Sequence, residues 1–301
     1  MRIALIALAI VGVFTYAPLA LADMSSTNFE IRWDTIGQGG DDTSSSASFL
    51  LRDTTGNAAI GGSSSSSFEM NAGYRGGVFD QVITFEVFAQ NNGSQRAATA
   101  AVGTTITCST AGLAEGDFVA LVQDEGASQV SAVGRIISIG AGTITVDELR
   151  DGGSAPVIDG TADFVYLLDA TTAALSTLDN AVVSTALVGF DVTAEVDGGY
   201  TVQIADDGNL RDGASDINDV ADGTVTAGSE EFGGRSSDTT LVGSSFDTAD
   251  SAITTSFQEV ATRSVVSFES RDFVTLKASI SGSTNDGSYA NALSFIVSGN
   301  Y

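Results

Sequence analysis

Acidic and amide side chains gather between residues 206 and 222, and their oxygens are the ligands that Ca²⁺ prefers. Ca²⁺ takes about six to eight oxygen ligands, which short loops of Asp and Asn can supply. The spacing Asp207-x-Asn209-x-x-Asp212 departs from the EF-hand loop, so the prediction is an irregular surface site. The alternative is a set of solvated turns, because Asp and Asn favour turns without any ion. The candidate ligands are Asp206, Asp207, Asn209, Asp212, Asp216, Asn218, Asp219 and Asp222.

The remaining composition excludes most catalytic chemistry. The sequence has no His and one Cys, so a Ser-His-Asp triad, a Cys-His dyad and a His-ligated zinc site are excluded. Paired carboxylates such as Glu230 and Glu231 could act on a glycosidic bond, but 38 acidic residues produce such pairs by chance. We expect no enzymatic activity and no cofactor besides Ca²⁺. Cys108 lies in an alternating stretch and is expected in a core.

The formal net charge of −26 limits the partners. A chain this acidic repels nucleic acid and anionic membranes, so neither is expected to bind. The expected partners are other copies of the chain or other surface proteins, with surface glycans as the alternative.

The first 22 residues have the layout of a secretory signal peptide. Arg2 precedes an apolar run over residues 3–21, and Ala20-Leu21-Ala22 supplies the small residues of a cleavage site. A membrane-spanning helix is the alternative, since about 20 apolar residues can cross a bilayer, but Pro18 argues against it. We expect a secreted protein on the cell surface, without membrane insertion once the leader is cleaved.

The remaining sequence predicts an all-β fold. Short runs of Thr, Val, Ile and Phe alternate with Asp-Gly, Gly-Gly and Asn-Gly turns, which is typical of many short strands. Residues 90–101 are expected to be a polar break. A small antiparallel β-barrel follows, and the C-terminal strands suggest an immunoglobulin-like sandwich. These sandwich strands are expected at residues 182–188, 191–194, 200–204, 265–267, 273–280 and 292–297.

Four regions follow from these patterns. Residues 1–22 are the signal peptide, and 23–80 are a Ser/Phe strand-repeat region. Residues 81–170 hold a strand and the barrel, which one interpretation treats as an insertion into the sandwich. Residues 171–301 form the sandwich with the Asp-rich loop.

The strand-repeat region contains three copies of one pattern. Phe29, Phe49 and Phe68 are spaced by 20 and 19 residues, and each follows small polar residues and precedes an aliphatic side chain two positions on. This period predicts one strand pair per repeat, although the Ser-rich spacers would also suit a flexible linker. Short strands expose backbone edges to which a neighbouring subunit can add.

These segments together resemble a group of uncharacterised bacterial secreted surface proteins, which carry N-terminal Ser-Ser-x-x-Phe repeats and a C-terminal immunoglobulin-like sandwich. The matching stretches are the three Phe repeats, Asn71-Ala72-Gly73-Tyr74, Gly198-Gly199-Tyr200-Thr201-Val202, residues 206–211 through 222–233, and Val297-Ser298-Gly299-Asn300-Tyr301. The resemblance implies a cell-surface location and a structural character. The sandwich is also faintly similar to WxL-type wall-binding domains, although no Trp-x-Leu occurs and the only Trp is Trp33.

The sequence therefore predicts a secreted, acidic structural protein of the cell surface. It would be a subunit of a surface layer, fibre or adhesive coat, with calcium as a stabilising ion. The alternative is an adhesin or a carbohydrate-binding module.

Overall fold

The computed structural model describes residues 82–300 and the backbone of six short strands nearer the N-terminus. The predicted signal helix over residues 1–22 lies outside the described residues. The described secondary structure consists of strands and the 3-10 turn η2 (Asn92–Ser94). Within this part of the chain, no helix is long and apolar enough to cross a membrane. The all-β prediction is confirmed.

The chain divides into two compact units, Met1–Asp80 and Gln81–Tyr301. The described residues of the first form three antiparallel strand pairs, and the second strand of each pair begins directly after the Phe of one repeat. The strands are β1 (Met24–Ser25), β2 (Glu30–Ile31), β3 (Ser44–Ser45), β4 (Leu50–Leu51), β5 (Gly61–Ser64) and β6 (Glu69–Ala72).

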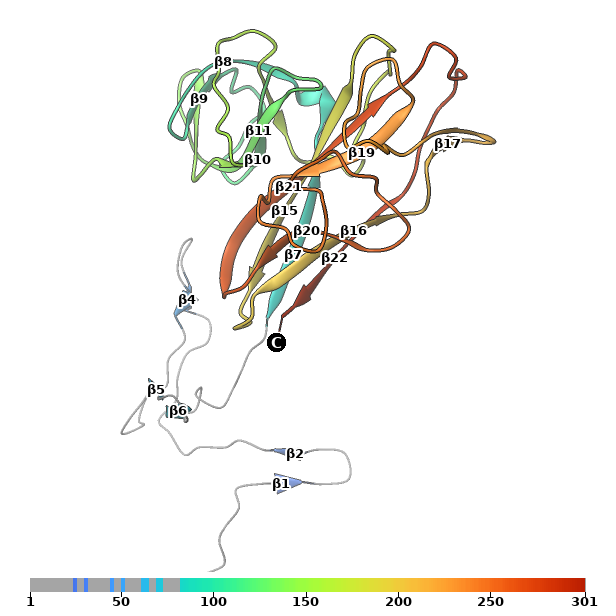
Figure 1. Ribbon diagram of the computed structural model, residues 1–301. Coiled ribbons are helices and arrows are strands. Elements are labelled where there is room, and N and C mark those ends of the chain that lie inside the picture. The colour runs from blue at the N-terminus through green and yellow to red at the C-terminus, as the bar shows by residue number, and fades with distance from the viewer. Residues whose placement is uncertain are drawn as a thin grey trace, which may run out of the picture. The chain divides into compact units, whose positions relative to one another are not determined.

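Two facing sheets form the larger part of the second unit (Figure 1). One has the order β19-β21-β15-β7 and the other β20-β16-β22, with all neighbours antiparallel. The strands are β7 (Ile83–Ala89), β15 (Ser184–Ala194), β16 (Tyr200–Asp206), β19 (Glu231–Ser236), β20 (Gln258–Arg263), β21 (Ser267–Ser279) and β22 (Leu293–Gly299). Alternate residues of both sheets, such as Phe190, Tyr200 and Leu276, point into one shared apolar core.

A ring of six strands lies in sequence between β7 and β15, which are neighbours in one sheet. The ring is therefore inserted between two adjacent strands. Its order is β10-β14-β8-β9-β12-β11, and a further pairing of β10 with β11 closes it. The strands are β8 (Arg96–Val102), β9 (Thr105–Cys108), β10 (Phe118–Gln123), β11 (Val130–Ile139), β12 (Thr143–Val146) and β14 (Phe164–Leu167), with β13 (Arg150–Asp151) beside β11.

The ring has its own core, to which Ile106, Leu121 and Ile144 contribute. Cys108 is buried there, as predicted, and burial raises the pKa of its thiol.

The structure corrects the expected polar break over residues 90–101. Its second half forms β8, because Ala98 fills the ring core and Arg96 bonds the carbonyl oxygens of Ser94, Ser109 and Ala111. Tertiary packing here overrides a composition that favours a loop.

Strands β19 and β20 were also missed. In β19, Gly233 and Gly234 interrupt the run of β-branched and aromatic residues that predicts a strand. Both positions nevertheless need a small residue. A Cβ on Gly233 would lie 2.5 Å from Val220 and 2.9 Å from the Ser251 carbonyl oxygen. Close approach of neighbouring segments therefore explains glycines that read as a turn in sequence.

Ring and sandwich meet at an apolar contact bordered by arginines. Phe88 of β7 stacks on Phe118 of β10 with ring centroids 4.4 Å apart. The guanidinium groups of Arg135 and Arg271 lie 4.3 and 5.1 Å from the centroid of the Phe118 ring. Arg135 of the strand ring and Arg271 of the sandwich therefore both make a cation–π contact with Phe118.

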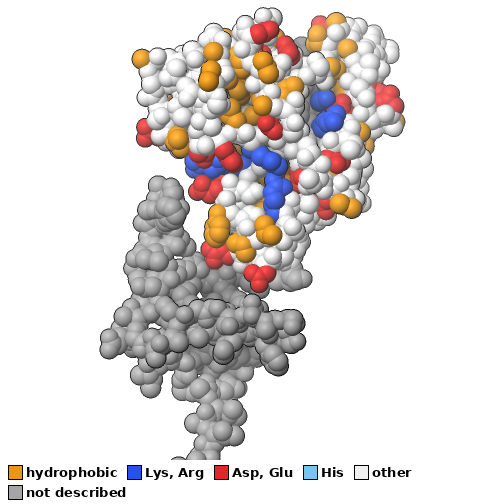
Figure 2. Space-filling view, turned by 60° about the vertical axis from the view of Figure 1, so that its left-hand side comes forward, with side chains coloured by type: hydrophobic (Ala, Val, Ile, Leu, Met, Phe, Trp, Pro, Cys, Tyr) orange, Lys and Arg blue, Asp and Glu red, His pale blue; other side chains and the backbone are white. Residues whose placement is uncertain are grey.

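Buried ion pairs connect the same two parts. Asp272 of β21 is fully buried and binds Arg150 of the ring at 2.8 Å and Arg263 of β20 at 2.5 Å. The adjacent Arg271 binds Asp191 of β15 at 3.1 Å and Asp147 of the ring at 2.6 Å. We call these residues the ionic junction. On the face that Figure 2 shows, basic side chains gather in groups bordered by acidic ones.

The sole lysine makes a further connection. The amine of Lys277 lies 2.9 Å from the Asp250 carboxylate and donates to the Ala127 carbonyl oxygen, in a ring loop, at 3.2 Å. Both side chains are buried away from water, so each charge is stabilised mainly by the other.

We expect Asp272→Ala to destabilise the protein by about 3–5 kcal/mol, because it removes the buried carboxylate that Arg150 and Arg263 share and leaves Arg263 with Asp238 alone. Asp286→Ala, at an exposed position, should change stability by less than about 0.5 kcal/mol. Urea unfolding followed by circular dichroism measures both. Equal stabilities of the two variants would contradict a structural role for the junction.

Candidate ligand-binding site

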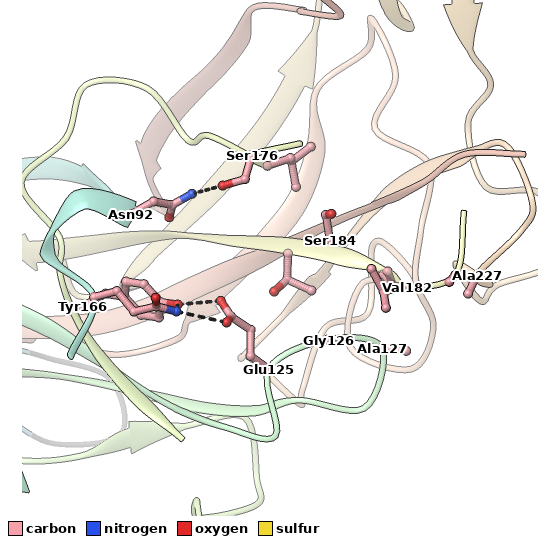
Figure 3. A pocket seen from close by; sticks show the side chains of 14 residues that line it. Asn92, Glu125, Gly126, Ala127, Tyr166, Ser176, Val182, Ser184 and Ala227 are labelled. Atoms are coloured by element: carbon pink, nitrogen blue, oxygen red, sulfur yellow. Dashed lines mark hydrogen bonds between the residues drawn. The ribbon is translucent and has the colours of Figure 1, made fainter. Parts of the chain in front are cut away.

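A pocket of about 590 Å³ opens where the ring meets the beginning of β15 (Figure 3). Three segments far apart in sequence form its walls: the η2 region, the loop after β10, and the chain leading into β15. The described lining residues are Asn92, Gln95, Glu125, Gly126, Ala127, Tyr166, Leu175, Ser176, Ala181, Val182, Val183, Ser184, Thr185 and Ala227.

A hydrogen-bonded chain of three side chains forms the polar wall of the pocket. The Tyr166 hydroxyl donates to Glu125 Oε1 at 2.6 Å and accepts from Gln95 Nε2 at 2.5 Å. Gln95 Nε2 also lies 3.4 Å from Glu125 Oε2. Tyr166 is buried in β14, whereas Glu125 is exposed. The hydrogen bonds therefore hold the Glu125 carboxylate at the pocket surface in one orientation.

The environment keeps the Tyr166 proton in place. Burial, followed by the hydrogen bond to Glu125 and its negative charge, raises the pKa of Tyr166 far above its usual range. The hydroxyl is therefore a permanent donor to Glu125 at physiological pH. The free lone pairs of the Glu125 carboxylate remain as acceptors for a ligand.

The opposite wall combines amide and hydroxyl groups with small apolar side chains. Asn92 donates to the Ser176 hydroxyl at 2.9 Å and to the Ala174 carbonyl oxygen at 2.7 Å. Thr185 donates to Gln129 at 2.5 Å, and Val182 lies exposed at the rim. Alternating polar groups and small apolar surfaces suit an uncharged ligand with several hydroxyl groups.

One residue that lines the pocket and one that precedes a lining residue adopt the left-handed backbone conformation, which residues with a side chain disfavour. Asp124, next to Glu125, has a φ of 50°, and Ser176 has a φ of 58°. Such conformations cost about 1–2 kcal/mol and tend to occur where a loop must present a side chain in one direction.

The described lining of the pocket is mostly uncharged. Glu125 is the one carboxylate among these residues, whereas glycoside hydrolysis uses two. Ser176 and Ser184 have no basic side chain beside them in the described lining, so neither is activated as a nucleophile.

The predicted calcium ligands surround the hairpin of β17 (Leu210–Asp212) and β18 (Ser215–Ile217), away from this pocket. Asp207 forms an ion pair with Arg211 at 2.5 Å. Asp216 accepts a hydrogen bond from the Asn209 amide at 3.0 Å. The carboxylates of Asp207 and Asp216 therefore each bind a side chain within residues 206–222.

Three further candidates make other hydrogen bonds, and of these only the bond to Asp222 caps a turn. Asp212 accepts from the Ser288 amide at 3.1 Å and Asp222 from the Thr224 amide at 3.1 Å, while Asn218 donates to Glu230 at 3.5 Å. Across the described residues, no three Asp, Glu or Cys side chains form a group that could hold a metal ion. Calcium binding by this segment stays a prediction.

Asp206 lies close enough to Asp219 to affect the titration of Asp219. Asp206 is buried and accepts from the Gly208 amide at 3.1 Å and from Asn291 at 3.4 Å. Asp219 Oδ1 is buried without a hydrogen-bond partner in the described structure. Burial, with the charge of Asp206, raises the pKa of Asp219 to about 6.

Comparison with protein-family models, with curated protein sequences and with solved structures finds no match for the chain.

We expect Asp219→Asn to stabilise the protein at pH 7–8 and not at pH 4. Between its unfolded pKa of about 3.9 and its folded pKa of about 6, Asp219 holds a proton only in the folded state, so stability falls as pH rises through this window. Above it the folded protein carries the full cost of the buried charge, which the amide removes. Thermal melts at both pH values measure the effect.

The exposed Asp222→Asn is the control and should change the melting temperature little at either pH. A stabilisation by Asp219→Asn of equal size at pH 4 and pH 8 would contradict the titration of this carboxyl.

Proposed function

We propose that this chain is a secreted, acidic structural protein of the cell surface, serving as a subunit of a surface layer, fibre or adhesive coat. The observation that carries the proposal is the pair of open sheet edges. β7 and β22 each pair with one strand only among the described strands, and they lie side by side (Figure 1). Open edges on one side of a rigid block are a means of joining subunits.

We infer that the ring is a small β-barrel and that the two sheets form an immunoglobulin-like sandwich into which it is inserted. The closed strand order and the division into four and three strands support this inference. The resemblance to bacterial surface proteins points in the same direction.

Export rests on the sequence of residues 1–22, which we propose are cleaved after Ala22. The net charge of −26 supports solubility outside the cell and makes nucleic acid an unsuitable partner. Calcium, bound by the Asp-rich segment, would lower the repulsion between acidic subunits.

We expect the purified mature protein to form assemblies that scatter light and appear in electron micrographs, and millimolar Ca²⁺ to promote them. Calcium should also raise the melting temperature, because an ion that binds only the folded state stabilises it. Chelator should reverse both effects. A protein that remains a monomer at all concentrations, with or without calcium, would contradict the structural role. An unchanged melt on adding calcium would remove the ion from the proposal.

The pocket favours a second function, binding of a surface glycan. The observation behind it is the fixed Tyr166–Glu125–Gln95 chain facing small apolar side chains, an arrangement that suits sugar hydroxyls. Binding and assembly are compatible, since no residue of the open edge strands β7 and β22 lines the pocket.

We expect glycan-array binding by the wild type, weakened at least about tenfold by Glu125→Gln, because a charge-assisted hydrogen bond contributes about 1.5–3 kcal/mol. Glu115→Gln changes an exposed carboxylate of the ring outside the pocket and should bind like the wild type. An array without hits, or equal loss in both variants, would remove this function.

A further inference from the structure

Strand β22 is an edge strand with one side unpaired. Its seven residues pair antiparallel with β16, from Asp206 opposite Leu293 to Tyr200 opposite Gly299, and no described strand pairs with its other side. Leu293, Phe295 and Val297 are only half-buried although they pack on the sandwich core. The core is thus incompletely covered along this edge.

The composition of β22 differs from that of the other three edges of the sandwich. Its sequence, Leu-Ser-Phe-Ile-Val-Ser-Gly, has no charged residue and no Pro. By contrast, β7 carries Glu86, β19 carries Glu231 and Arg235, and β20 carries Glu259 and Arg263. Charged residues and Pro are the usual means by which proteins keep edge strands from pairing, and β22 has neither.

The lack of charge has a particular consequence in this chain. With a net charge of −26, two copies repel each other over most of their surface. A contact through β22 brings no charged side chains of the paired strands together, so like-charge repulsion between opposite residues is absent.

The strand is also complementary to itself. If two copies pair antiparallel about a two-fold axis at Ile296, Ser294 lies opposite Ser298 and Phe295 lies opposite Val297. The side chains on the core face then meet core-face side chains of the other copy. The exposed face places serine against serine on either side of an Ile296 pair. Such symmetry is the requirement of an isologous interface.

We propose that β22 pairs with β22 of a second copy of this chain, joining two three-stranded sheets into one continuous sheet of six strands. The inference rests on the proposed function, because it names the first contact of the assembly. A single strand pair is smaller than a standard protein interface, so the dimer is expected to form reversibly in the micromolar range.

Sedimentation velocity over a wide range of concentrations tests the proposal with a charged variant. Ile296 is 39% exposed, so Ile296→Lys leaves the core intact while placing two like charges at the axis. We expect the dissociation constant to rise at least about tenfold. Ile137→Lys is the matched control, because Ile137 is 54% exposed and lies on β11, a strand of the ring that is paired on both sides and belongs to neither open edge. It should self-associate like the wild type, and thermal melts verify that both variants fold.

Disulfide trapping tests the register. Residues directly opposite in antiparallel strands have Cβ atoms about 4.5–5.5 Å apart, close enough for a disulfide after a small adjustment. Under mild oxidation Ile296→Cys should give a covalent dimer. Ser298→Cys should not, because its opposite residue is Ser294. Cys108 is buried in the ring and does not interfere.

The outcomes separate this inference from the proposed function. A wild type that stays monomeric overturns both. If the wild type assembles and Ile296→Lys assembles equally well, another contact such as the Phe repeats holds the subunits, and only the β22 pairing is overturned. Equal cross-linking of Ile296→Cys and Ser298→Cys also overturns it, because a fixed register links only the first.

Discussion

The arrangement of the described residues depends on a pair of adjacent charges in β21. Arg271 and Asp272 each bind at least one charged group of the ring and at least one of the sandwich. Burying these groups costs several kcal/mol per ion, and only partners in the right geometry offset that cost. A displaced ring would leave charges buried without counter-ions. The junction therefore selects one orientation of ring and sandwich more than it adds net stability.

The shape of the pocket depends on this orientation of ring and sandwich. Tyr166 and Glu125 belong to the ring, whereas Ser184 and Thr185 belong to β15 of the sandwich. Their separation is fixed only if the two parts do not move against each other. The bond from Lys277 to the ring loop at Ala127 strengthens the same constraint beside the pocket. A site between two rigidly joined β-structures is preorganised, which reduces the entropy lost when a ligand binds.

Sequence patterns predicted the fold class well and the tertiary details poorly. Alternating apolar residues and Gly-containing turns were sufficient for an all-β fold and for many of the strands. The pattern failed at β8 and β19, where Ala98 and Gly233 are fitted to close neighbours that no local signal reveals. The pocket was missed for the same reason, since Asp124-Glu125-Gly126 reads as a turn. A tyrosine in the apolar strand 164–168 was the one available signal, because a buried hydroxyl needs a partner.

Residue-resolved hydrogen exchange on the intact chain tests most directly whether ring and sandwich form one cooperative body. The slowest amides of β14 and of β21 should exchange with the same free energy, because the junction couples opening of the ring to global unfolding. Asp272→Ala should separate the two values, with the β14 amides exchanging faster than those of β21. A wild-type ring whose amides all exchange well before those of β21 would show independent opening and contradict the account.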